Sequence, residues 1–91
     1  DSMLSTRSLE KITKGFSNHR RIQILALLGD KPNLSVFEIS EELKVNFKTI
    51  SEHVRRLFIA GLVKKKSEGT IVRHKLSDLG QYALKFLRAI G

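Results

Sequence analysis

Residues 34–76 decide the fold and read LSVFEISEELKVNFKTISEHVRRLFIAGLVKKKSEGTIVRHKL. Near the start of this stretch, Ser35 and Glu38 have the spacing of a capping box, in which a hydroxyl and a carboxylate accept hydrogen bonds from free backbone N–H groups at a helix start. We therefore predict a helix that runs from there to about Leu43. Its apolar residues follow a helical period and are expected to face a core: Val36, Phe37, Ile39 and Leu43.

A second helix is predicted only a few residues later, over residues 47–60. Asn46 is a suitable N-cap, and Gly61 can end the helix because glycine adopts the left-handed conformation at low cost. One stripe of this helix is apolar and is expected to pack inward, with Ile50, Val54, Leu57 and Phe58. The opposite side carries Lys48, Ser51, Glu52 and Arg55 at i, i+3, i+4 and i+7, with Thr49 and Arg56 beside them.

A basic β-hairpin is predicted over residues 62–76, with its turn near Ser67, Glu68 and Gly69. On the return strand, Val72, His74 and Leu76 share one face. The hairpin cations are candidate contacts to phosphates: Lys64, Lys65, Lys66, Arg73 and Lys75. The alternative is an edge hairpin that lysines protect against aggregation.

Helix, tight turn, helix and basic hairpin are the order of a winged helix-turn-helix. The polar face of the second helix suits the DNA major groove, where arginine or lysine can bond guanine and a carboxylate can accept from cytosine. The candidate base or phosphate contacts are Asn46, Lys48, Thr49, Ser51, Glu52, His53, Arg55 and Arg56. The alternative for this face is a solvated surface with intrahelical ion pairs.

Further helices are expected on both sides of this stretch. A weakly amphipathic helix over residues 5–15 is expected to end at Gly15, and a stronger one to run from Ser17 or Asn18 to Gly29. Leu34 is a candidate third strand beside the wing. The fold class is thus mostly α with a small β-hairpin wing, about five helices and two or three short strands, in a single domain over residues 1–91. Asp1 and Ser2 precede Met3 and are interpreted as cloning residues.

A last helix is predicted over residues 78–90, with Ser77 as its N-cap. Its broad apolar stripe, together with that of the first helix, is interpreted as a homodimer interface formed by Leu9, Ile12, Leu79, Tyr82, Phe86 and Ile90. The alternative is that the stripe folds back on its own core.

Composition agrees with a polyanionic partner, since the 91 residues carry a net charge of +8. The chain has no cysteine, which excludes disulfides and thiolate metal sites. The apolar runs are too short to cross a bilayer and no signal peptide is visible. We therefore expect a cytoplasmic, nucleoid-associated protein that binds double-stranded DNA without a cofactor or a membrane.

The sequence resembles ArsR-type winged-helix repressors over roughly residues 16–76. One stretch is similar to the family's N-P-T-R-L-x-I-L pattern, with His19 in place of proline, through Asn18, Arg21, Ile22, Ile24 and Leu25. Residues 35–43 are similar to L-S-x-x-E-L-A-x-x-L, and the pattern S-x-T-V-S-x-H-L-x-x-L-x-x-A-G-L-V is matched by Thr49, Ile50, Ser51, His53, Val54, Leu57, Ala60, Gly61, Leu62 and Val63. After the wing, Leu76, Ser77 and Gly80 resemble the L-T-x-x-G of MarR- and PadR-like regulators.

The resemblance implies a DNA-binding transcriptional regulator, usually a homodimeric repressor. It implies DNA contacts at Lys48, Thr49, Ser51, Glu52 and His53. Phe47 and Glu52 depart from the family's usual glutamine and arginine, so the family's operator cannot be transferred, and Phe47 is expected to cap the core. The family's metal ligands are not matched, because the first motif helix has Val36 and Phe37 where cysteines would stand and the last helix has no histidine.

The three histidines lie on separate elements without a ligand spacing, so no metal site is expected, and His53 is interpreted as a packed, hydrogen-bonded residue. An enzyme is the weakest hypothesis, because the sequence has no phosphate loop, cysteine nucleophile or carboxylate pair placed with a histidine. The sequence lacks the aromatic-rich strands that stack single-stranded bases, so RNA binding is less favoured than DNA binding. The main rival is a winged helix that docks on protein, and the cationic face favours DNA over it.

Overall fold

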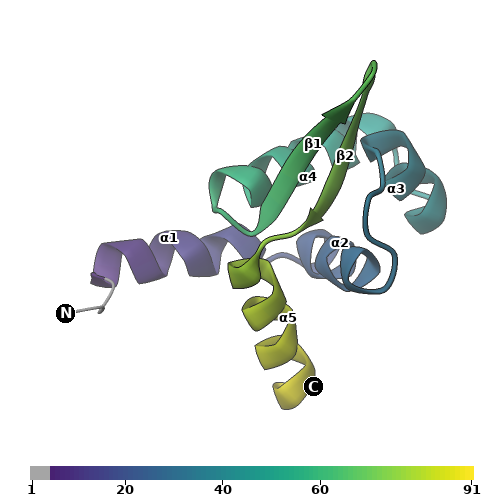
Figure 1. Ribbon diagram of the computed structural model, residues 1–91. Coiled ribbons are helices and arrows are strands. Elements are labelled where there is room, and N and C mark those ends of the chain that lie inside the picture. Colours follow the sequence, from purple (N-terminus) through teal and green to yellow (C-terminus); the bar gives the residue numbers. More distant parts are fainter. Residues whose placement is uncertain (1–4) are drawn as a thin grey trace.

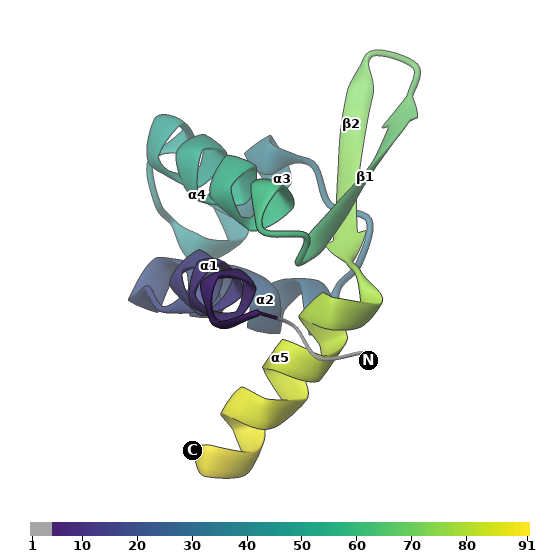
Figure 2. The same cartoon turned by 90° about the vertical axis from the view of Figure 1, so that its left-hand side faces the viewer.

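The computed structural model describes residues 5–91, so Asp1 and Ser2 lie outside the described residues. Five helices and one hairpin follow in the order α1 (Thr6–Phe16), α2 (His19–Asp30), α3 (Val36–Leu43), α4 (Phe47–Ile59), β1 (Val63–Glu68), β2 (Ile71–Leu76) and α5 (Asp78–Ile90) (Figure 1). This order confirms the predicted winged helix-turn-helix. The hairpin and α5 extend to opposite ends of the molecule in both views (Figure 2).

The helix-turn-helix forms as its capping residues predict. Ser35 accepts a hydrogen bond from the backbone of Glu38 at 3.1 Å, and the Glu38 carboxylate accepts one from the Ser35 backbone at 2.9 Å, which completes the capping box. Lys44 ends α3 in the left-handed conformation, and Asn46 caps α4 two residues later. Gly61 then leaves α4 with a φ of 80°, as expected for a helix stop.

The wing is a two-stranded antiparallel sheet. Its turn lies one residue later than predicted, because Glu68 pairs with Ile71 and leaves Gly69 and Thr70 as the loop. Gly69 has a φ of 66°, the conformation that a type II′ turn needs at its first loop position. Leu34 forms a single β-bridge with His74, so the third strand is reduced to one residue.

The core lies where α2, α3, α4 and the base of the wing meet. Its fully buried side chains include Ile24, Leu25, Ile39, Ile50, Leu57 and Leu62. Two residues expected there are not buried: Phe37 is 60% exposed and Phe58 is 44% exposed. Both lie at the edge of their helix's apolar stripe, where the neighbouring elements leave them partly uncovered.

Two glycines expected to end helices lie within them instead. Gly15 is a buried residue of α1, where an added Cβ would overlap the Cβ of Ala60, the C-cap residue of α4. Gly29 is in α2, where a Cβ would come within 2.5 Å of Leu84 on α5. Both glycines therefore permit close helix packing, and the caps of α1 and α2 are Ser17 and Lys31.

Candidate nucleic-acid interface

Helix α4 is fixed in place with its polar face toward solvent. The Asn46 side chain accepts hydrogen bonds from the backbone N–H groups of Lys48 and Thr49 at 2.7 and 3.2 Å. The buried stripe of α4 holds the opposite face to the core, as predicted, through Ile50, Val54 and Leu57. Lys48, Thr49 and Arg55 are exposed and Ser51 is partly exposed, so this face is available to a ligand.

Glu52 binds two arginines on the same helix. Its carboxylate accepts from Nε and Nη2 of Arg55 at 3.1 and 2.8 Å, and from Nε of Arg56 at 2.9 Å. Hydrogen bonding from Arg55, followed by that from Arg56 and the charge of both, lowers the pKa of Glu52 to about 2. The ion pairs of the alternative interpretation are thus present, and they hold two guanidinium groups close to the face that is predicted to meet DNA.

His53 is partly buried between α4 and α2. Its Nδ1 accepts a hydrogen bond from Nε of Arg21 at 3.3 Å. Burial, and next the charge of Arg21, lower the pKa of His53. A side chain held in this way fits the interpretation of His53 as a packed, hydrogen-bonded residue, and its contact with DNA stays a prediction.

Most cations of the wing lie on one face of the hairpin. Lys64 is directly opposite Lys75, and Lys66 is directly opposite Arg73, so these four side chains share a face. Like charges in direct cross-strand pairs destabilise a sheet. Arg73 is offset by Glu68 and Glu38, so within the described part of the chain the pair without an acidic partner is that of Lys64 and Lys75, whose repulsion a negatively charged ligand would relieve.

Two wing cations have partners within the protein. Lys65 lies on the other face, where its Nζ is 4.3 Å from the centre of the Phe58 ring on α4. Arg73 donates to Glu68 at 3.0 Å, to Glu38 at 3.1 Å and to the backbone carbonyl of Asn33 at 3.1 Å. These contacts fix the base of the wing against α4 and against the start of α3.

Phe47 does not cap the core, contrary to the expectation from sequence. It is 52% exposed. With Phe37, Ile71 and Val72 it lines a hollow between α3, the start of α4 and the wing. The helical period places Phe47 at the end of the apolar stripe. Because Phe47 is the first residue of α4, no preceding turn of this helix covers its side chain.

The predicted dimer residues form exposed apolar faces on α1 and α5. Tyr82 is 71% exposed, Phe86 57% and Ile90 68%, while Leu9 is 50% exposed and Leu79 37%. Ile12 is partly buried. On the inward side of α5, Ala83 and Leu84 are buried and Leu87 packs against the core. The stripe of α5 is therefore too broad for the core of one chain to cover.

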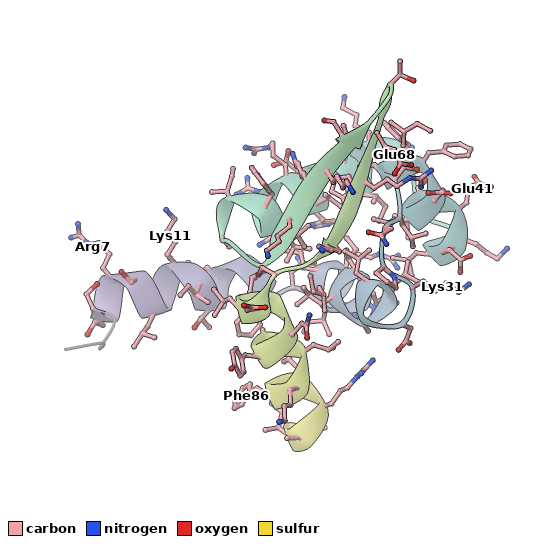
Figure 3. The ribbon with its side chains drawn as sticks, viewed as in Figure 1. Arg7, Lys11, Lys31, Glu41, Glu68 and Phe86 are labelled. Carbon is pink, nitrogen blue, oxygen red and sulfur yellow. The ribbon has the colours of Figure 1, made fainter. Side chains whose placement is uncertain are left out.

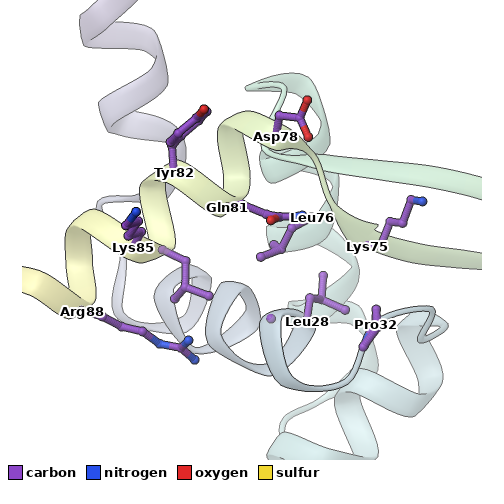
Figure 4. A pocket seen from close by; sticks show the side chains of 11 residues that line it. Leu28, Pro32, Lys75, Leu76, Asp78, Gln81, Tyr82, Lys85 and Arg88 are labelled. Atoms are coloured by element: carbon purple, nitrogen blue, oxygen red, sulfur yellow. The ribbon is translucent and has the colours of Figure 1, made fainter.

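A further hollow lies between α2, the end of β2 and α5 (Figure 4). Lys75, Gln81, Tyr82, Lys85 and Arg88 contribute to its lining. Arg88 is paired with Asp30 on α2 at 3.4 Å. This hollow is separated from the polar face of α4 by the core.

A group of cations on α1 was not among the residues proposed from sequence. Arg7, Lys11 and Lys14 line a third hollow together with Arg55 and Arg56 of α4. Their spacing of i, i+4 and i+7 is visible in the sequence and places them on one helix face. That face lies beside α4 because Gly15 packs closely against Ala60. From sequence, Gly15 is expected to end the helix and not to pack against another one.

Within residues 5–91, no three histidine, aspartate or glutamate side chains come together in a way that could hold a metal ion. None of the five helices in that range combines the length and the apolar composition needed to cross a membrane.

Comparisons with known proteins agree with the fold and show the family. Residues 18–65 match the model of the family described as bacterial regulatory protein, arsR family. An HTH-type transcriptional regulator of Methanocaldococcus jannaschii is 42% identical over 60 residues, which are 66% of this chain and 67% of that protein. The transcriptional activator HlyU of Vibrio cholerae is 38% identical over 67 residues, which are 74% of this chain but only 61% of the activator.

Solved structures show the same architecture over almost the whole chain. A structure of HlyU from Vibrio cholerae has a TM-score of 0.81 at 30% identity, and the match covers 93% of this chain and 92% of that one. A homodimeric winged helix-turn-helix DNA-binding domain from Mycobacterium bovis has a TM-score of 0.83 at 24% identity, covering 99% and 89% of the two chains. At 24% identity, the likeness to the Mycobacterium bovis domain shows a shared fold.

Proposed function

The chain belongs to the arsR family of bacterial regulatory proteins, and from this premise we propose that it regulates transcription as a homodimer that binds specific sequences of double-stranded DNA. The observation that carries the proposal is the arrangement of α4 and the wing. An exposed helix face with lysine, threonine, serine and arginine lies beside a hairpin with four cations on one face. A protein-docking winged helix does not require that arrangement.

In the proposed complex, α4 lies in the major groove. Lys48 and Arg55 have side chains that can bond guanine O6 and N7, and Ser51 and Thr49 can bond several bases. The Glu52 carboxylate can accept from the cytosine amino group. Arg55 and Arg56, which Glu52 holds in the free protein, can exchange that carboxylate for phosphates or bases.

The wing supplies affinity that depends little on sequence. Lys64, Lys66 and Lys75 point from one face of the hairpin and are placed to contact phosphates. Arg73 joins the wing to the start of α3 through Glu38, and its ion pair with Glu68 lies within the hairpin. We assign Arg73 mainly to positioning the wing, with phosphate contact as its second role.

The homodimer rests on the exposed apolar faces of α1 and α5. Tyr82, Phe86 and Ile90 leave more than half of their surface in water in a single chain. Contiguous apolar patches of this kind mark interaction sites, and two-fold symmetry lets two copies of α4 meet half-sites one helical turn apart. The homodimeric fold neighbour from Mycobacterium bovis has the same architecture.

We propose repression as the regulatory outcome, because a dimer on its operator occupies DNA that other proteins would need. The protein acts by binding alone, without catalysis or a cofactor, and works at the nucleoid in the cytoplasm. Transcription in vitro from a promoter that carries the operator should fall when wild type is added. It should be unaffected by the Lys48→Ala, Arg55→Ala variant.

Titration of a labelled duplex at several salt concentrations tests the DNA contact itself. Wild type should bind tightly and with a strong dependence on salt, and the Lys48→Ala, Arg55→Ala variant should lose its preference among sequences. The matched control is Lys85→Ala, Arg88→Ala, which removes the same charge from α5. Lys66→Ala should weaken binding to all sequences alike. Wild-type affinity no better than roughly 10⁻⁴ M at physiological salt would reject the proposal in favour of protein docking.

A further inference from the structure

Helix α1 is amphipathic, and its two faces have different chemistry. Leu9, Ile12 and Phe16 follow one stripe, whereas Arg7, Lys11 and Lys14 occupy another at i, i+4 and i+7. Phe16 packs against the core of its own chain, and the proposed dimer gives a role to Leu9 and Ile12. The proposed function gives no role to the basic stripe.

The basic stripe of α1 faces the same side of the molecule as α4. Figure 3 shows the side chains of Arg7 and Lys11 pointing to the side on which α4 lies, whereas Phe86 on α5 lies on the opposite side. Within residues 5–91, neither Arg7 nor Lys11 forms an ion pair, while Lys14 pairs with Glu10 at 3.3 Å. Two cations of the stripe are therefore unneutralised by the described part of the chain.

Close packing fixes α1 relative to α4. Gly15 lies against Ala60 so tightly that a Cβ at position 15 would overlap the Ala60 side chain. Arg21 on α2 donates to the backbone carbonyls of Lys14 and Gly15 at 2.8 and 3.4 Å, which satisfies the end of α1. The basic stripe is thus held at a fixed place beside the C-terminal half of α4.

Together α1 and α4 line a strongly cationic hollow. Six basic side chains and one acidic side chain contribute to its wall, with Ile59 and Ala60 at its base: Arg7, Glu10, Lys11, Lys14, Arg21, Arg55 and Arg56. The hollow is continuous with the polar face of α4, since Arg55 belongs to both. Its charge suits a polyanion that already contacts α4.

The polar face of α4 lies between the wing and α1. On one side Phe58 contacts Lys65 of β1, and on the other side Ala60 packs on Gly15 of α1. A helix in the major groove, which is about 12 Å wide, has a phosphate backbone on each side. Cations on the wing can reach one of these backbones, and cations on α1 are placed to reach the other.

We propose that Arg7 and Lys11 bind backbone phosphates of the operator on the side of α4 opposite the wing, so that α1 is a second electrostatic arm of the DNA reader. The inference rests on the proposed function. It assigns α1 two tasks on two faces, dimer contact through its apolar stripe and phosphate contact through its basic stripe. Because phosphates carry no base identity, these contacts add affinity without sequence preference.

The salt dependence of binding measures these contacts. Each phosphate contact contributes a slope of about 0.9 to the fall of log K with log salt. Arg7→Gln, Lys11→Gln should therefore lower the slope by about 1.8 per protomer, which is about 3.6 for the dimer, and the loss of affinity between about 50 and about 200 mM salt should become about 150-fold smaller. The ratio of affinities for operator and unrelated duplex should not change.

Two control variants distinguish a direct phosphate contact from an effect of the protein's net charge. Arg7→Lys, Lys11→Arg keeps both charges and should retain the wild-type slope. Lys85→Gln, Arg88→Gln removes the same charge from α5 and should change the slope by much less. Sedimentation equilibrium of each variant checks that the dimer is unaltered.

The inference would be overturned, with the proposed function intact, if wild type binds the operator but the α1 and α5 variants have equal slopes of log K against log salt. A Gln variant that weakens the dimer without lowering the slope per dimer would also overturn it. A wild type that fails to bind any duplex rejects the proposed function itself.

Discussion

Glu52→Gln should strengthen the part of DNA binding that does not depend on sequence. In the free protein the Glu52 carboxylate holds Arg55 and Arg56 by three hydrogen bonds of 2.8 to 3.1 Å. Its pKa is lowered to about 2 by the two arginines, so the carboxylate is ionised at neutral pH. The substitution keeps the shape of the side chain, removes one negative charge from the DNA-facing surface and releases two guanidinium groups.

The size of the effect follows from counterion release. If one released arginine in each protomer gains a phosphate, the slope of log K against log salt for the dimer steepens by about 1.8, and if both do, by about 3.6. The ratio of affinities at about 50 and about 200 mM salt then rises about 12-fold or about 150-fold. Since Glu52 is also the candidate acceptor for cytosine, preference for cytosine at one operator position should disappear in the same variant.

Fluorescence anisotropy of labelled operator and unrelated duplexes over a salt series measures both effects. The matched control is Glu42→Gln, which removes the same charge from α3, where Glu42 pairs with Lys31 at 3.1 Å. Both variants alter exposed carboxylates, and their thermal unfolding should stay close to that of wild type. An unchanged slope for Glu52→Gln, or one equal to that of Glu42→Gln, would refute the placement of Arg55 and Arg56 at the DNA.

Further predictions concern stability and assembly. Burial lowers the pKa of His74, so the free energy of unfolding should fall as the pH drops from about 7 through the unfolded pKa near 6.5. In the His74→Asn variant the side chain can still donate a hydrogen bond to the Leu34 carbonyl, which lies 3.0 Å from Nδ1 of His74. Urea titrations at each pH should therefore show a smaller fall for this variant than for wild type. Gly80→Ala should lower the free energy of unfolding by about 1–3 kcal/mol, because a Cβ there would overlap the Leu62 carbonyl oxygen, and a urea melt that matches wild type would contradict that packing. Phe86→Ser removes an exposed ring from the proposed interface and should raise the dimer dissociation constant at least about tenfold in sedimentation equilibrium.

Local signals predicted the helix-turn-helix and the wing because their determinants are close in sequence. The capping box needs only Ser35 and Glu38, and the start of α4 needs only Asn46. Gly61 and Gly69 both have a positive φ, as turn chemistry requires. Each of these interactions spans few residues, so a single sequence contains it in full.

The errors concern residues whose role depends on a distant element. Gly15 and Gly29 were interpreted as helix ends, but each is a small residue against another helix. Phe37 and Phe58 follow the apolar period of their helices, yet the neighbouring elements do not cover them. Periodicity gives the direction of a side chain on its helix and not what lies opposite.

The sequence predicts which charged residues share a face of one helix, but it does not predict which ion pairs form between distant elements. The sequence placed Glu52 beside Arg55 and Arg56 on one helix, and both alternatives for that face followed from the spacing. The three-way contact of Arg73 with Glu38, Glu68 and Asn33 joins residues up to 40 positions apart, so it depends on the fold. The cationic hollow between α1 and α4 was missed for the same reason.

Enrichment of binding sequences from a random duplex library tests the central claim, that α4 reads DNA in a symmetric dimer. We expect wild type to select an inverted repeat whose half-site centres are about 10–10.5 base pairs apart or a multiple of that spacing. The Lys48→Ala, Arg55→Ala variant should lose the preference at particular positions within each half-site. A wild-type pool that shows no common sequence after repeated selection would contradict the claim.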